Sequence, residues 1–135
     1  MRNLGHRLAL ILLPIAVIGA SAGCGGSESG GASGPPRTVS LEAVEYRFQA
    51  DEAITIRAGD TIEFEVRNGG DLEHQMEVWD ANNRVLGMTE RIPPGAVRSV
   101  TVTFDDAGAY RVVCDIDDHL IQGQQAGFDV FDAND

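Results

Sequence analysis

The sequence predicts an all-β fold, a Greek-key antiparallel β-sandwich, and three observations support that prediction. Apolar and polar residues alternate with a period of two in several short stretches, as they do in strands with one buried face. Turn signals rich in glycine, proline, asparagine and aspartate separate these stretches. No strong amphipathic helical pattern interrupts the series. Short strands at this spacing are typical of antiparallel sandwiches and barrels.

The clearest alternation places Ile62, Phe64 and Val66 on one face, with charged residues between them. A second run alternates apolar residues with threonines at residues 100–104. Strands are expected at residues 39–48, 53–57, 62–67, 73–79, 100–104, 110–114 and 127–131. Turns are expected at residues 58–60, 68–70, 93–95 and 106–108.

The run Asp-Ala-Gly-Ala-Tyr at residues 106–110 resembles the tyrosine corner of Greek-key sandwiches. In that motif a tyrosine hydroxyl binds the backbone of a crossing loop, and the resemblance implies this role for Tyr110. The motif supports the fold and carries no information about a ligand.

The first residues predict export rather than part of the fold. Arg2 and Arg7 precede an apolar run at residues 8–20, which is shorter than the roughly 20 residues that span a bilayer but suits a secretory signal. The run ends in Ser-Ala-Gly-Cys, which resembles the lipobox of bacterial lipoproteins. That resemblance implies a signal peptide at residues 1–23 and a lipid on Cys24, which would anchor the chain to the outer face of the cytoplasmic membrane or to the cell envelope. The alternative is ordinary signal cleavage with Cys24 left free.

The composition of the remaining chain indicates a tether followed by a domain, and its charge limits the kinds of partner. Residues 24–37 are mostly glycine, serine and proline, so they are expected to form a flexible tether before a domain at residues 38–135. The chain carries 21 acidic and 10 basic residues, for a net charge of −11. This balance argues against nucleic-acid binding, because phosphates need basic partners. It suits a basic protein partner, or simply solubility.

Four residues of the predicted domain share a pattern typical of a metal centre. His74 lies on an apolar strand face, where a single histidine is usually a core residue. Cys114 ends an apolar strand, and His119 and Gln124 follow it in a Cys-x4-His-x4-Gln spacing. Two imidazoles and one thiolate with a weak axial ligand, which can be methionine or glutamine, form blue-copper sites. Gln122, Gln125 or no side chain are the alternatives for the axial place.

These residues, with the runs at 108–114 and 123–128, resemble the cupredoxin family over residues 38–131. The spacing of the ligand loop is similar to that of rusticyanin-like and stellacyanin-like members, and stellacyanins have glutamine at the axial place. The resemblance implies one type 1 copper bound by the four residues named above. Two departures stand out: Asp117-Asp118 replaces a common Pro-Gly, and Gln75 replaces an asparagine that braces the ligand loop.

The resemblance further implies a carrier of single electrons between protein redox partners outside the cytoplasmic membrane, with electrons entering through the solvent-facing edge of His119. No nucleophile triad, phosphate loop or paired-carboxylate motif appears, so an enzyme is not expected. Two alternatives remain. One is a protein that stores or delivers copper, and the other is a metal-free interaction module with Cys114 as a small buried hydrophobe.

Overall fold

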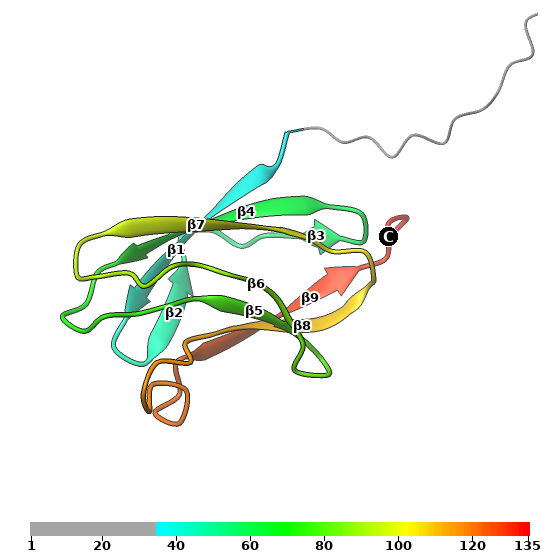
Figure 1. The fold of residues 1–135 in the computed structure, drawn as a ribbon. Helices are drawn as coiled ribbons and strands as arrows, with labels where there is room; N and C mark the ends of the chain where they lie inside the picture. Colours follow the sequence, from blue (N-terminus) through cyan, green and yellow to red (C-terminus); the bar gives the residue numbers. More distant parts are fainter. Residues whose placement is uncertain (1–34) are drawn as a thin grey trace, which may run out of the picture.

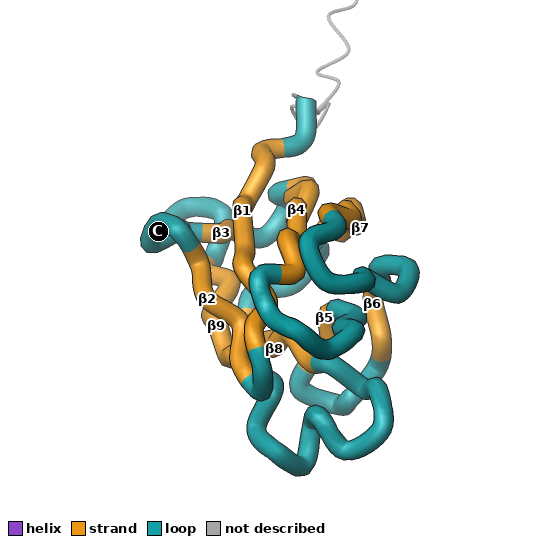
Figure 2. Tube along the Cα trace, turned by 90° about the vertical axis from the view of Figure 1, so that its left-hand side faces the viewer, coloured by secondary structure: helices purple, strands orange, loops and turns teal. Residues whose placement is uncertain are grey.

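The computed structural model describes residues 35–135, and within that range it contains strands, turns and loops (Figures 1 and 2). The predicted signal peptide, Cys24 and most of the predicted tether lie outside the described residues. The strands are β1 (Arg37–Val44), β2 (Arg47–Ala50), β3 (Ile56–Arg57), β4 (Thr61–Asn68), β5 (Glu77–Asp80), β6 (Val85–Met88), β7 (Val97–Thr103), β8 (Gly108–Val113) and β9 (Gln125–Phe131). No helix within residues 35–135 is long and apolar enough to cross a bilayer.

The strands form two facing sheets, which confirms the predicted sandwich (Figure 1). One sheet has the order β2-β1-β4-β7, and the other has the order β3-β9-β8-β5-β6. Most neighbouring strands are antiparallel, but β1 runs parallel to β4 and β3 runs parallel to β9. The sheets are therefore mixed rather than purely antiparallel. Side chains alternate with a period of two in parallel and antiparallel strands alike, so the sequence pattern could not show which strands run parallel.

The core lies between the sheets and consists of the faces that the alternation predicted. Ile62, Phe64 and Val66 of β4 are all at most 2% exposed. The Phe64 ring lies 6.2 Å from the Phe104 ring, edge to face, and Phe128 packs against both. Burial of such side chains is the main force that holds two sheets together.

The tyrosine corner is confirmed. The Tyr110 hydroxyl donates a hydrogen bond of 2.8 Å to the backbone carbonyl of Asp106. The Tyr110 ring also packs edge to face on Phe104, at 5.0 Å between centroids. The corner therefore ties the loop before β8 to the aromatic core.

The predicted strand at residues 39–48 is wrong in one respect, because it is a hairpin. Val44 of β1 pairs with Arg47 of β2, so Glu45 and Tyr46 form a two-residue turn. Neither residue is a typical turn former, and Tyr46 adopts a φ of 63°. The predicted strand at residues 73–79 is also shorter than expected, since β5 begins only at Glu77.

Candidate metal centre

The loop between β8 and β9 begins with Cys114, has His119 at its middle and ends with Gln124. The Cys114 N–H donates to the Gln124 carbonyl at 3.0 Å, which extends the β8–β9 ladder by one step. The Gln124 N–H in turn donates to the His119 carbonyl at 2.9 Å. These two hydrogen bonds draw a loop of eleven residues into a compact turn structure, and they bring its three candidate ligands together.

His74 comes from a different part of the chain, just before β5. Its backbone N–H donates to the Ile92 carbonyl at 3.1 Å, and the Ile92 N–H donates back at 2.7 Å. Because β5 pairs with β8, this segment lies beside the end of β8. The N–H of Gln75 points at the Cys114 sulfur, at 3.5 Å.

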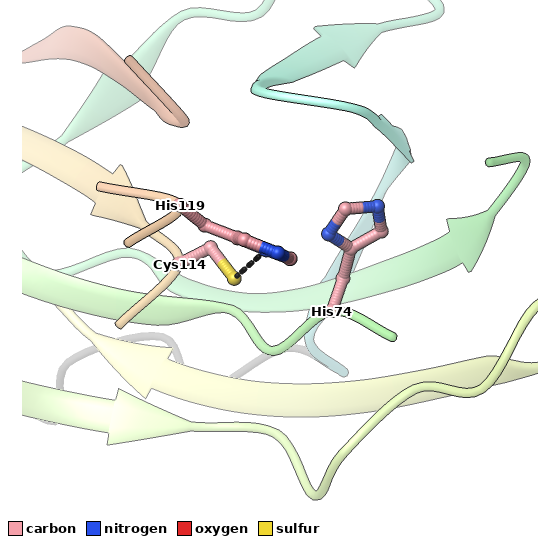
Figure 3. Close-up of side chains that lie close together, drawn as sticks. All are labelled: His74, Cys114 and His119. Atoms are coloured by element: carbon pink, nitrogen blue, oxygen red, sulfur yellow. Dashed lines mark hydrogen bonds between the residues drawn. The ribbon is translucent and has the colours of Figure 1, made fainter. Parts of the chain in front are cut away.

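The three predicted strong ligands converge on one buried point. The candidate ligand atoms of His74, Cys114 and His119 all lie within 4.8 Å of one another. The Cys114 sulfur is 3.5 Å from Nδ1 of His119, and the two imidazole rings lie 5.2 Å apart at 59° (Figure 3). His74 and Cys114 are fully buried, and His119 is 5% exposed. Little of the His119 edge therefore meets solvent.

Several polar atoms at this point have no hydrogen-bond partner among the described residues. They are both ring nitrogens of His74 and the amide oxygen of Gln124. Gln124 is fully buried, and its amide nitrogen donates to the Val44 carbonyl at 3.2 Å. Buried polar atoms without partners are costly and rare in native structures. A cation between these groups would give a partner to one His74 nitrogen and to the Gln124 oxygen, so the residues present fit a metal ion.

The electrostatics suit a site that takes up a cation. Burial raises the pKa of the Cys114 thiol, although the N–H groups of Gln75 and Ile116 lower it in part. Burial lowers the pKa of His74, and the neighbouring His119 lowers it further. At neutral pH the metal-free site therefore holds a neutral thiol and a neutral His74 imidazole. A bound cation would stabilise the thiolate that burial alone disfavours.

Comparison with known proteins places this arrangement in a family. The family model of the cupredoxin-like domain matches residues 11–125. The chain belongs to the cupredoxin-like family. No curated protein matches the sequence.

Solved cupredoxin structures share the fold at low sequence identity. An auracyanin from the photosynthetic bacterium Roseiflexus castenholzii is 18% identical, with a TM-score of 0.59 over 72% of this chain and 98% of its own. Auracyanin A of Chloroflexus aurantiacus, described as a "blue" copper protein, is 18% identical, with a TM-score of 0.60 over 70% of this chain and 98% of its own. A copper-containing nitrite reductase of Thermus scotoductus is 21% identical, with a TM-score of 0.54, and the match covers 73% of this chain but 28% of the reductase. At these identities the likeness shows the fold alone.

The structure shows what the residues at the two departures from the usual cupredoxin pattern contact. The Gln75 side chain donates to the Thr89 carbonyl at 3.0 Å, so it braces the segment after β6 instead of the ligand loop. In the ligand loop Asp117 adopts a φ of 48°, and the Asp118 carboxylate accepts a hydrogen bond of 3.1 Å from the Gln122 amide. The loop of this cupredoxin is therefore braced within itself.

Sequence reasoning missed Asn68, which holds the segment before His74. Asn68 is fully buried, and its side-chain nitrogen donates to the carbonyls of Leu72 and Ile92, both at 2.7 Å. Its side-chain oxygen accepts from the Gly70 N–H at 2.9 Å. Its position offered a signal, because residue 68 continues the buried face of residues 62, 64 and 66. A polar residue on that face predicts a buried hydrogen-bond network.

Proposed function

We propose that this cupredoxin binds one type 1 copper ion and carries single electrons between protein partners. Cys114, His74 and His119 would form the strong ligand plane, with the Gln124 amide oxygen as the weak axial ligand. The observation that carries the proposal is the convergence of three buried ligand groups within 4.8 Å, with both His74 nitrogens unpartnered. One thiolate, two imidazoles and a weak axial donor are the donor set of blue-copper centres. The blue copper protein among the structural neighbours adds support.

Bound copper supplies a one-electron redox couple, and the chain's residues set the conditions for it. His74 precedes β5 and Cys114 follows β8, and these two strands pair within one sheet, so the fold would hold the two ligands in one arrangement in both oxidation states. The Gln75 N–H at 3.5 Å withdraws some charge from the Cys114 sulfur. Because the ligands are buried, they would keep water away from a bound copper ion and so limit rearrangement on electron transfer.

The burial of the site favours electron transfer over copper delivery. None of the four proposed ligands is more than 5% exposed. Release of the metal would require the 114–124 loop to open, whereas an electron can cross the protein layer with the loop closed. A delivery protein is expected to exchange its metal readily.

The proposal is tested by loading the purified protein with copper(II). We expect one copper per chain and an intense thiolate-to-copper charge-transfer band in the visible spectrum, with a reversible one-electron wave in voltammetry. Cys114→Ser should abolish the band while leaving the fold intact, because the two side chains have similar size. A loaded wild-type protein without the band would refute the blue-copper assignment. Rapid loss of copper to a weak chelator would favour delivery instead.

We also propose that the protein is exported and anchored through lipidated Cys24, which would hold it near membrane redox partners. The support is the apolar run that ends in Ala22-Gly23-Cys24. Cys24→Ala is expected to release the domain from the membrane fraction or to block its processing. A processed variant that stays in the membrane fraction would show that the lipid anchor is wrong.

A further inference from the structure

The turn between β1 and β2 touches three different parts of the metal centre with three consecutive residues. The Val44 carbonyl accepts the Gln124 amide hydrogen bond at 3.2 Å. The Glu45 carboxylate accepts the N–H groups of Asp71 and Leu72, at 2.5 and 3.0 Å, in the segment that leads to His74. The Tyr46 ring packs edge to face on the His119 ring, at 5.6 Å and 84°.

The conformation of Tyr46 is unfavourable for its residue type. Its φ of 63° lies in the left-handed region, where glycine is favoured and a bulky side chain is rare. Tyr46 is also 37% exposed as a whole residue, so core burial does not explain its presence. Unfavourable backbone geometry of this kind is concentrated at functional sites. Tyr46 instead packs over His119, and His119 is only 5% exposed.

The contact of Glu45 depends on a glycine. A Cβ atom on Gly70 would overlap the Glu45 carboxylate, so the carboxylate occupies space that a side chain would otherwise fill. From there it reaches the two N–H groups that follow Gly70 in the chain. Hydrogen bonds from the backbone N–H groups of Leu72, of Glu45 itself and of Asp71 lower the pKa of the Glu45 carboxyl, so it is charged at neutral pH.

We propose that Val44, Glu45 and Tyr46 act as positioning residues that hold Gln124, the segment before His74, and His119 in the copper-binding arrangement before the metal arrives. We call these three residues the turn clamp. Through it the β1–β2 hairpin holds the ligand loop, which joins two strands of the other sheet, and the connection after β4 that leads to His74. The assignment of copper rests on the proposed function, but the positioning of the two histidines in the metal-free protein does not.

The clamp makes a prediction that a merely structural turn does not. If Tyr46 only stabilises the fold, its removal lowers the stability of the metal-free protein and the retention of metal together. If Tyr46 positions His119, the two properties separate, because Tyr46→Gly relieves the backbone at φ 63° while it removes the ring. Tyr46→Phe is the matched control, since it keeps the ring that contacts His119.

The first test compares the full chain with its Tyr46→Gly and Tyr46→Phe variants. We expect the metal-free Tyr46→Gly protein to unfold at the same or a higher urea concentration than wild type. Its His119 ring signals, followed by NMR with isotope-labelled histidine, should show averaging over several conformations. Its copper should pass to a chelator about five- to tenfold faster, the scale of one aromatic contact. Tyr46→Phe should match wild type in all three measurements.

Wild-type His119 signals and wild-type copper release in Tyr46→Gly would overturn the proposal, as would parallel losses of stability and retention. If wild-type protein binds no copper, the proposed function fails, whereas the NMR comparison still decides whether the clamp positions His119.

The second test separates the position of Glu45 from its charge. Gly70→Ala should displace the carboxylate from the Asp71 and Leu72 N–H groups without altering its charge. Glu45→Gln should remove the charge but keep an oxygen acceptor for both groups. We expect Gly70→Ala to disturb the His74 ring signals of the metal-free protein, and Glu45→Gln to leave them nearly unchanged. If Glu45→Gln disturbs the His74 signals and Gly70→Ala does not, Glu45 acts through its charge. Its assignment as a positioning residue would then be wrong.

Discussion

Replacement of Asn68 by alanine should destabilise the metal-free protein substantially. The side chain makes three hydrogen bonds, with the carbonyls of Leu72 and Ile92 and with the Gly70 N–H. Each such bond contributes a net value of about 1 kcal/mol. The Ile92 carbonyl keeps a second partner, the His74 N–H at 3.1 Å, which limits the loss at that atom. We therefore expect Asn68→Ala to lower the free energy of unfolding by about 2 kcal/mol.

Urea unfolding at neutral pH measures this loss. An unchanged slope of the free energy of unfolding against urea concentration would show that the substitution has altered stability alone. Asn82→Ala is the matched control, because Asn82 is exposed and its replacement should alter stability by no more than about 0.5 kcal/mol. Asn68→Asp keeps the size of the side chain but cannot donate to the two carbonyls, so it should lose at least as much as alanine. A loss below about 1 kcal/mol in Asn68→Ala would refute the reasoning.

Two further predictions concern the axial place and the tyrosine corner. Gln124→Met should raise the reduction potential, because a thioether is a softer donor than an amide oxygen and favours copper(I). Voltammetry measures the shift in potential, and roughly 60 mV corresponds to a tenfold change in the equilibrium constant for one-electron reduction. An unchanged or lowered potential would show that Gln124 is not the axial ligand. Tyr110→Phe should lose about 1 kcal/mol at neutral pH with the hydrogen bond to Asp106. Burial raises the pKa of Tyr110, so its contribution is complete below the unfolded value near 10 and is lost as pH rises through the folded pKa. The difference between wild type and Tyr110→Phe in urea unfolding should therefore narrow in alkali, and a constant difference would contradict this account.

The sandwich and the convergence of three candidate ligands could be predicted because each leaves a local pattern. Alternation along β4 marks a buried face, and the spacing of Cys114 and His119 lies within one loop. The family resemblance then related His74 to that loop, and the structure places it there. The assignment of all four residues as copper ligands stays a prediction.

The turn clamp and the role of Asn68 could not be predicted in the same way. The apolar positions change from odd to even numbers at Val44, but no glycine or asparagine marks a turn there, so one long strand was predicted where a hairpin forms. The packing of Tyr46 on His119 joins residues far apart in the chain, and no local period records such a contact. Asn68 stands before two glycines, which made it resemble an ordinary turn residue although it is buried.

The complete burial of Cys114 also has a consequence for the protein before it meets copper. A thiol reacts with oxidants and disulfides chiefly as the thiolate, and the raised pKa of Cys114 keeps it in the less reactive thiol form. The sulfur is also fully enclosed, so no second protein can approach it. In an oxidising compartment these two features would slow the formation of a mixed disulfide or a sulfenic acid. Enclosure of the sulfur thus preserves the chain's capacity to take up metal.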